Sequence, residues 1–207
     1  MKRWGLMLVA LFLAPILVAC GQTTQAEDRL DQSTPSLQEQ IRGAVIVPPR
    51  QIEDFTLPST DGEFRFSDLR GKLVLIYFGY MTCPDVCPTS GAHLKRVYEE
   101  INRPDDLAVV FVTVDPERDT LDRLRPYIKL FNEDFVALRG EGDALQEVFT
   151  QFGVVAIRRQ VGESALSYLM DHTASIFLVN QEGLLISQFI FGLGADDILH
   201  DVELLLE

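Results

Sequence analysis

The stretch LVLIYFGYMTCPDVCP, residues 73–88, decides the fold of this chain. Six apolar residues from Leu73 to Phe78, rich in branched and aromatic side chains, are typical of a strand that is buried on both faces. A loop with two cysteines follows. Pro88 suits the first turn of a helix but not its interior, so a helix is expected to begin here. The stretch therefore predicts a strand, a loop that carries two thiols, and a helix.

A second buried strand is predicted at residues 107–114, after a helix whose apolar stripe contains Leu94, Val97, Tyr98 and Ile101. A strand–helix–strand crossover makes the two strands parallel and is nearly always right-handed. Later segments predict helices at residues 120–131 and 143–152, a short strand at 136–138, a hairpin at 175–191 and a last helix from residue 196. The class is therefore α/β, with a central mixed sheet flanked by helices.

Residues 54–66 alternate in polarity around Asp61-Gly62, which predicts an added N-terminal β-hairpin. The preceding residues, 20–49, are mostly polar and end in Pro48-Pro49, as expected of a flexible tether. Residues 50–207 are long enough for one domain of ordinary size with its own core. The sequence thus predicts a tether followed by a single folded domain.

The first 19 residues hold Lys2 and Arg3, then an uncharged apolar run, then small residues before Cys20. This order is typical of a secretory signal, and it is similar to a bacterial lipoprotein signal in which the cysteine is lipidated. An uncleaved membrane anchor is the alternative interpretation. In either case the protein is held at a membrane and its body lies outside the cytoplasm.

The charge of the chain limits its partners. The formal net charge is −13, and removing residues 1–19 takes away two of the 18 basic residues and none of the 31 acidic ones, which leaves −15. Nucleic-acid binding needs basic surface that displaces counterions from phosphate groups, so most of it is excluded. The same balance argues against holding anionic lipid by charge.

Three cysteines are present, Cys20, Cys83 and Cys87. A disulfide between the last two would close a very short loop and stabilise the fold little, so a purely structural bridge is disfavoured. Two thiolates held close together are soft donors that suit Cu(I) and are acceptable to zinc. Two close thiols can equally cycle with a disulfide. The spacing alone leaves the metal site and the redox site open.

The chain has three histidines, and His172 is the one expected near the cysteines. It precedes a strand that should run antiparallel to the first pair, and the start of such a strand lies beside the carboxyl ends of its neighbours. His172 is therefore either a metal ligand or a capping or packing residue. His93 and His200 lie on predicted helices and are expected to be solvated.

Several acidic residues follow the second strand and could line the same rim: Asp115, Glu117 and Asp119. Hard oxygen donors suit Cu(I) poorly, so we expect these residues to serve loop structure instead, with Thr120 or Asp119 capping the helix that follows. The alternative is a secondary role in tuning the site or meeting the partner. Asp85 is expected mainly to be a turn residue; the alternative is that its carboxylate accepts a hydrogen bond that orients the ligands. The pair at residues 158–159, Arg-Arg, is expected to be a solvated strand face.

Four segments together resemble the Sco/SenC family: FGY (78–80), TCPDVCP (82–88), VDPERDT (114–120) and DHT (171–173). These proteins are thioredoxin-like copper-binding factors for assembling the dinuclear copper centre of cytochrome c oxidase. The resemblance runs from about residue 52 to residue 205. It implies a thioredoxin-like fold for residues 50–207, and it implies that Cys83, Cys87 and His172 bind copper.

The resemblance further implies a copper chaperone tethered by Cys20 to the cell membrane and facing the periplasm or another extracytoplasmic space. Its partners would be the copper-bearing oxidase subunit and a protein that reduces the thiols. The alternative is a thiol–disulfide reductase that uses Cys83 and Cys87 as its redox pair; a thiol peroxidase fits less well. Thioredoxins carry a cis-proline near the position of Asp171-His172-Thr173, and its absence here favours metal binding.

Overall fold

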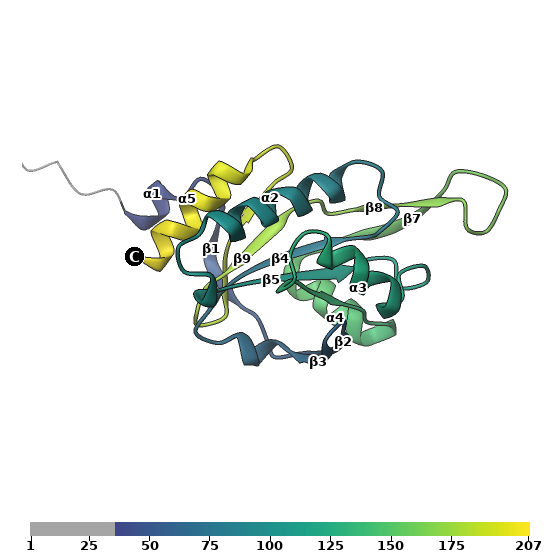
Figure 1. The fold of residues 1–207 in the computed structure, drawn as a ribbon, viewed down its shortest axis with the longest axis horizontal. Coiled ribbons are helices and arrows are strands. Elements are labelled where there is room, and N and C mark those ends of the chain that lie inside the picture. The colour runs from purple at the N-terminus through teal and green to yellow at the C-terminus, as the bar shows by residue number, and fades with distance from the viewer. Residues whose placement is uncertain (1–35) are drawn as a thin grey trace, which may run out of the picture. The chain divides into compact units, whose positions relative to one another are not determined.

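The structure of this chain is a computed structural model that describes residues 36–207. The signal predicted at residues 1–19, the lipidation predicted at Cys20 and the tether up to residue 35 lie outside the described residues. Residues 36–207 form one unit (Figure 1). Its helices are α1 (Leu37–Gln40), α2 (Val86–Glu100), α3 (Leu121–Lys129), α4 (Gly142–Phe152) and α5 (Ala195–Leu206), with 3-10 turns at Phe66–Leu69 and Pro104–Asp106.

Within residues 36–207 the main sheet has eight strands in the order β1-β10-β9-β4-β5-β6-β2-β3. Their bounds are β1 (Ala44–Gln51), β2 (Thr56–Ser59), β3 (Gly62–Arg65), β4 (Leu73–Gly79), β5 (Leu107–Thr113), β6 (Val136–Leu138), β9 (Ile176–Val179) and β10 (Leu184–Phe189). β4, β5 and β6 are parallel, and β9 is antiparallel to β4. The predicted mixed sheet and the predicted hairpin, β2–β3, are confirmed.

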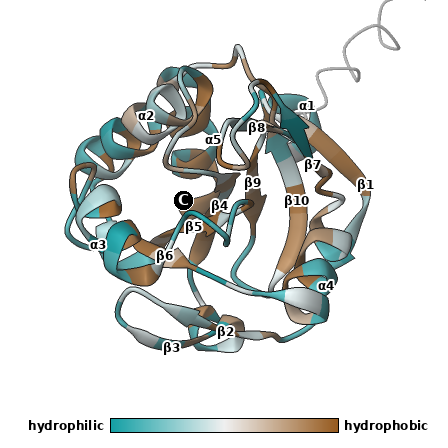
Figure 2. Cartoon of the chain, turned by 90° about the vertical axis from the view of Figure 1, so that its right-hand side faces the viewer, coloured by the Kyte–Doolittle hydropathy of each residue, from teal (hydrophilic) through white to brown (hydrophobic). Residues whose placement is uncertain are grey.

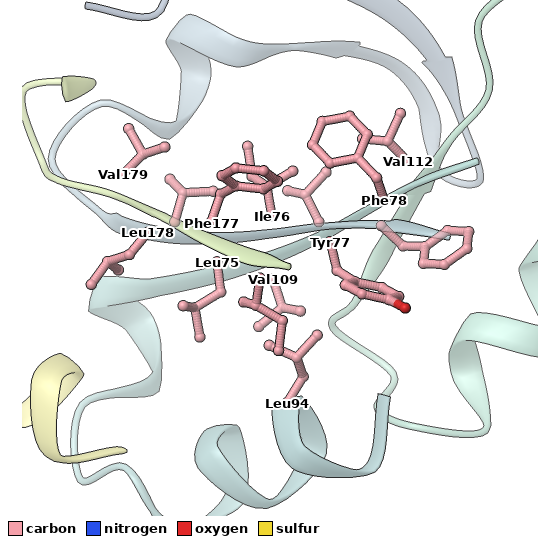
Figure 3. Packing of buried hydrophobic residues seen from close by; sticks show 14 of the residues in the cluster. Leu75, Ile76, Tyr77, Phe78, Leu94, Val109, Val112, Phe177, Leu178 and Val179 are labelled. Carbon is pink, nitrogen blue, oxygen red and sulfur yellow. The ribbon is translucent and has the colours of Figure 1, made fainter. Parts of the chain in front are cut away.

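All seven residues of β4 are buried, as the apolar run predicts. Because successive strand side chains point to opposite faces, β4 supplies both layers of the core. Figure 3 shows Leu75 and Tyr77 on the side of Leu94 from α2, while Ile76 and Phe78 point to the other side. A strand buried in this way fixes the position of the loop that follows it.

The helices cover both faces of the sheet. On the Tyr77 side, Tyr77 contacts Phe111 of β5, and Phe111 packs against Tyr127 of α3. On the opposite side, the ring of Phe78 lies 5.3 Å from that of Phe152 in α4. Figure 2 shows the apolar central strands enclosed between these helices. None of the helices between residues 36 and 207 is long and apolar enough to cross a bilayer.

The domain begins earlier than the sequence predicts. Residues 44–49, expected to belong to the flexible tether, are part of β1, which pairs with β10 at residues 44–45 and again at residues 50–51. The register shifts between these two stretches, and Pro48 and Pro49 lie in that gap. Prolines are tolerated at bulges and on edge strands, where no ladder hydrogen bond is lost. The strand β1 therefore begins six residues before the boundary predicted at residue 50.

A second sheet is absent from the sequence-based prediction. In residues 36–207 it consists of β7 (Ala156–Gln160) and β8 (Tyr168–His172), paired antiparallel from Ala156↔His172 to Gln160↔Tyr168. Figure 1 shows this hairpin reaching out from the body of the domain. His172, one of the candidate ligands, lies at the inner end of hairpin β7–β8, opposite Ala156.

Candidate metal centre

The cysteine loop connects β4 to α2 in a tight path. The backbone N–H of Cys83 donates to the carbonyl of Tyr80 at 3.2 Å, and α2 begins at Val86, so Cys87 lies in its first turn. Cys87 is 1% exposed. A Cβ on Gly79 would lie 3.0 Å from Sγ of Cys87, so only glycine lets this thiol pack against the end of the strand. Cys83 and Cys87, the two cysteines among the described residues, are free thiols, and Cys83 is the more exposed one.

His172 presents one ring nitrogen to the thiols. Its Nε2 lies 3.7 Å from Sγ of Cys87. Its Nδ1 lies 3.0 Å from the carbonyl oxygen of Thr173, which can only accept, so the Nδ1–H donates there. The neutral ring then keeps its lone pair on Nε2, which is the usual arrangement of a metal-binding histidine. The ring packs edge-on against Tyr80, with centroids 5.7 Å apart.

The two sulfur atoms and one imidazole nitrogen lie within 4.8 Å of one another, and within residues 36–207 this is the group of donors close enough to hold a metal ion. Metal–sulfur and metal–nitrogen bonds of about 2.3 and 2.0 Å at trigonal angles would place S and N about 3.7 Å apart. That separation matches the distance from Cys87 to His172. Two thiolates and an imidazole suit a soft ion such as Cu(I).

The two thiols differ in acidity. The hydrogen bond from Cys87 is the main cause that lowers the pKa of Cys83 to about 3, and hydrogen bonds from the backbone amides of Asp85 and Cys87 lower it further. The pKa of Cys87 is raised, first by its hydrogen bond to Cys83 and then by burial. The hydrogen bonds therefore favour the negative charge on the half-buried Cys83 and the proton on the fully buried Cys87.

An open groove leads to the centre. Its lining includes Cys83 and His172, together with Pro84, Leu169 and Arg159. Cys83 is therefore accessible to a solute or to another protein, whereas Cys87 is shielded behind it. Such a groove permits transfer of a bound ion to a partner.

The acidic residues after β5 lie behind the centre instead of contributing to it. Asp115 and Asp119 are 2% and 0% exposed. The N-cap residue of α3 is Thr120, which makes no side-chain hydrogen bond to the helix. Asp119 does not cap the helix, and its Oδ2 accepts a hydrogen bond from the backbone N–H of Met81 at 3.1 Å. Glu117 pairs with Arg158 on the surface at 2.9 Å. Of the two expected caps, Thr120 therefore takes the N-cap position, while Asp119 serves loop structure.

The remaining candidates supply no side-chain atom to the group of donors. Asp85 is exposed at the N-cap position of α2 and makes no side-chain cap bond. His93 is half-buried on α2 and is not among the grouped donors. His200 hydrogen-bonds to the buried carboxylate of Asp201 at 2.9 Å. Arg158 is not merely solvated, because its guanidinium lies 3.7 Å from the ring centroid of Tyr168.

The fold and the donors define a thioredoxin-like α/β domain that carries two thiols and one imidazole at the carboxyl end of its central strand. The family model described as SCO1/SenC matches residues 46–207. The chain belongs to the SCO1/SenC family.

Individual relatives agree with this assignment. A SCO2-like protein of Rickettsia prowazekii is 36% identical over 147 residues, which is 70% of this chain and 72% of the relative. The solution structure of apo Sco1 from Thermus thermophilus has a TM-score of 0.71 at 36% identity and covers 79% of this chain and 95% of its own. ScoI of Bradyrhizobium japonicum, solved with copper bound, has a TM-score of 0.67 at 32% identity and covers 75% and 99%. The thioredoxin-like fold is thereby confirmed.

Proposed function

We propose that this chain is a copper-binding assembly factor whose ligands are Cys83, Cys87 and His172. The observation that carries the proposal is the cluster of soft donors found within residues 36–207, in which His172 Nε2 faces Cys87 Sγ at 3.7 Å while the other ring nitrogen bonds to Thr173. Relatives support the choice of ion, since the Bradyrhizobium japonicum protein is described with copper bound. Membership of the SCO1/SenC family supports the assembly role.

The residues act in an order set by their exposure. Cys83, ionised and facing the groove, makes the first contact with an incoming Cu(I) ion. Cys87 must lose its proton to become a donor, so binding releases a proton and depends on pH. His172 completes the site without reorienting, because the bond from Nδ1 to Thr173 holds the ring. Release to a partner would reverse these steps through the same groove.

The acceptor in this proposal is the copper-bearing subunit of cytochrome c oxidase. A second partner protein reduces the thiols, because a disulfide between Cys83 and Cys87 could not bind the ion. The protein is tethered by a lipid on Cys20 and faces the periplasm or another extracytoplasmic space; the basic start, apolar run and small residues before Cys20 support this location. Replacing Cys20 with serine should release the protein from membranes or leave it unprocessed, whereas processing and retention equal to wild type would contradict the tether.

The alternative function is thiol–disulfide exchange, and the unequal acidity of the two thiols favours it. The thiolate of Cys83, which lines the groove, could attack a partner's disulfide, and the shielded Cys87 could then resolve the mixed disulfide. Both functions use the same pair of thiols. His172 separates them, because a third donor is needed for the metal ion and not for exchange.

The proposal is tested by titrating the reduced full chain with Cu(I) against a coloured Cu(I) chelator. We expect one ion bound per chain, and we expect Cys83→Ser and Cys87→Ser each to abolish competition with the chelator. Insulin reduction measured on the same samples tests the alternative. A reduced wild-type protein that reduces insulin and fails to compete for Cu(I) would overturn the copper proposal.

A further inference from the structure

Hairpin β7–β8 needs an explanation, because it carries His172 and yet belongs to a sheet separate from the one that carries the cysteines. The two halves of the centre are therefore not linked by a shared strand ladder. Figure 1 shows the hairpin extending beyond the body of the domain. Residues 173–175 join His172 to β9, which pairs with β4, and contacts from other elements hold the rest of the hairpin.

Side-chain contacts from the loop after β5 hold the hairpin. Arg118 donates from Nη1 to the carbonyl of Tyr168 at 2.9 Å and to that of Leu166 at 3.3 Å. The hydroxyl of Tyr168 donates to Asp115 at 2.7 Å. Glu117 pairs with Arg158 of β7 at 2.9 Å. Residues 115, 117 and 118 thus bind both strands of the hairpin.

Arg118 is the centre of this network. Its side chain is 12% exposed and pairs at 2.5 Å with Asp115, which is 2% exposed. Its guanidinium carbon lies 3.6 Å from the ring centroid of Tyr168 and 5.8 Å from that of Tyr80. Tyr80 in turn packs edge-on against the ring of His172. Arg118 therefore contacts the strand of His172 and the aromatic ring on which His172 rests.

The same loop also holds the cysteine half of the centre. Oδ2 of Asp119 accepts from the backbone N–H of Met81, two residues before Cys83, and from the hydroxyl of Thr113 at 2.7 Å. Asp119 is fully buried, so these bonds are shielded from water. One five-residue loop thus contacts both the thiol loop and the histidine hairpin.

We infer that residues 115–119 are the positioning element of the metal centre, in which Arg118, clamped by Asp115, sets the position of His172 relative to the two thiols. This explains the VDPERDT segment, whose carboxylates supply no ligand. The predicted effect of Arg118 on Cu(I) affinity rests on the proposed copper site. Its geometric content, that Arg118 holds the His172 ring against Tyr80, is independent of any metal.

The test compares Arg118→Gln with Arg125→Gln, a matched control whose guanidinium pairs with the exposed Asp61 far along the chain. In the metal-free full chain, the nuclear Overhauser effect between the ring protons of Tyr80 and His172 should persist in wild type and Arg125→Gln and disappear in Arg118→Gln. With Cu(I), the loss of a supporting contact should weaken binding by about 10- to 100-fold in Arg118→Gln and leave Arg125→Gln unchanged.

A double-mutant comparison separates positioning from general damage. If Arg118 acts through His172, then adding Arg118→Gln to His172→Ala should change Cu(I) affinity by less than about threefold. If the loss of Cu(I) affinity in the double variant equals the product of the losses in the two single variants, the inference is overturned. An unchanged contact between the Tyr80 and His172 rings in folded Arg118→Gln would also overturn it. A wild type that shows the ring contact but binds no Cu(I) would refute the copper proposal alone.

Circular dichroism establishes folding of each variant. If Arg118→Gln does not fold, Tyr168→Phe is the variant that tests the inference. This change removes the hydrogen bond from the Tyr168 hydroxyl to Asp115 and keeps the aromatic ring that stacks against Arg118. We expect a weaker ring contact and an affinity lower by about threefold to tenfold, as for one lost hydrogen bond. Wild-type values of both measurements in Tyr168→Phe would then overturn the inference.

Discussion

Replacing Gly79 with alanine tests how closely the end of β4 packs against the buried thiol. The added Cβ would lie 2.8 Å from Cε1 of Tyr77, 3.0 Å from Sγ of Cys87 and 3.0 Å from Cε2 of Phe111. Optimal carbon contacts lie at about 3.5–4.0 Å, so these buried neighbours must move. Overpacking of this kind lowers the free energy of unfolding by about 1–3 kcal/mol.

Urea unfolding followed by circular dichroism measures the loss. With a slope of about 2 kcal/mol per molar urea, the midpoint of Gly79→Ala should fall by about 0.5–1.5 M. Gly194→Ala is the control, because its Cβ meets nothing within 4 Å and its φ of −95° suits alanine; it should cost less than about 1 kcal/mol. Equal midpoints for Gly79→Ala and wild type would refute the close packing of Cys87.

Further predictions concern the thiols and the carboxylate behind them. Oxidising Cys83 and Cys87 to a disulfide should abolish Cu(I) binding and reduction should restore it, because thiolates are the donors; equal binding after complete oxidation would contradict the site. Asp119→Ala should lower the free energy of unfolding by about 2–4 kcal/mol in urea, since buried groups of Met81 and Thr113 lose their acceptor, and wild-type stability would refute this. Burial raises the pKa of Asp119 in the folded protein above its ordinary value of 3.8, so protonation of this carboxyl stabilises the folded state. This stabilisation is complete below pH 3.8 and is lost as the pH rises through the pKa of Asp119 in the folded protein. The stability of wild type relative to Asp119→Asn should therefore fall with rising pH across that window, and a difference independent of pH would contradict the buried carboxyl.

Elements with a strong local pattern could be predicted from the sequence. The apolar runs of β4 and β5 are long enough to require burial on both faces, and the crossover between them fixes their parallel pairing. Gly153 ends α4 in the left-handed region with φ of 69°, as a glycine after an amphipathic helix predicts. The cysteine loop follows from the same local logic.

Pairings held by distant contacts could not be predicted. Residues 158–159 lie in a strand, β7, as expected, but its pairing with β8 had no local signal, because it depends on stacking of Arg158 on Tyr168 and on the ion pair of Arg158 with Glu117. β1 contains two prolines, which in sequence resemble a linker until β10 supplies a pairing partner. The position of His172 near the thiols was predicted from strand direction, but Arg118 had no local signal beyond its place in the VDPERDT segment.

The most direct test of the central claim is the Cu(I) affinity of His172→Ala compared with wild type, measured on reduced full chain by chelator competition. In the proposed site Nε2 of His172 is the third donor, so removal of the ring should weaken binding by more than about 100-fold while Cys83 and Cys87 still form a disulfide. Circular dichroism controls for folding, since His172 ends β8. Wild-type Cu(I) affinity in a folded His172→Ala protein would contradict the three-ligand site and leave thiol–disulfide exchange as the function.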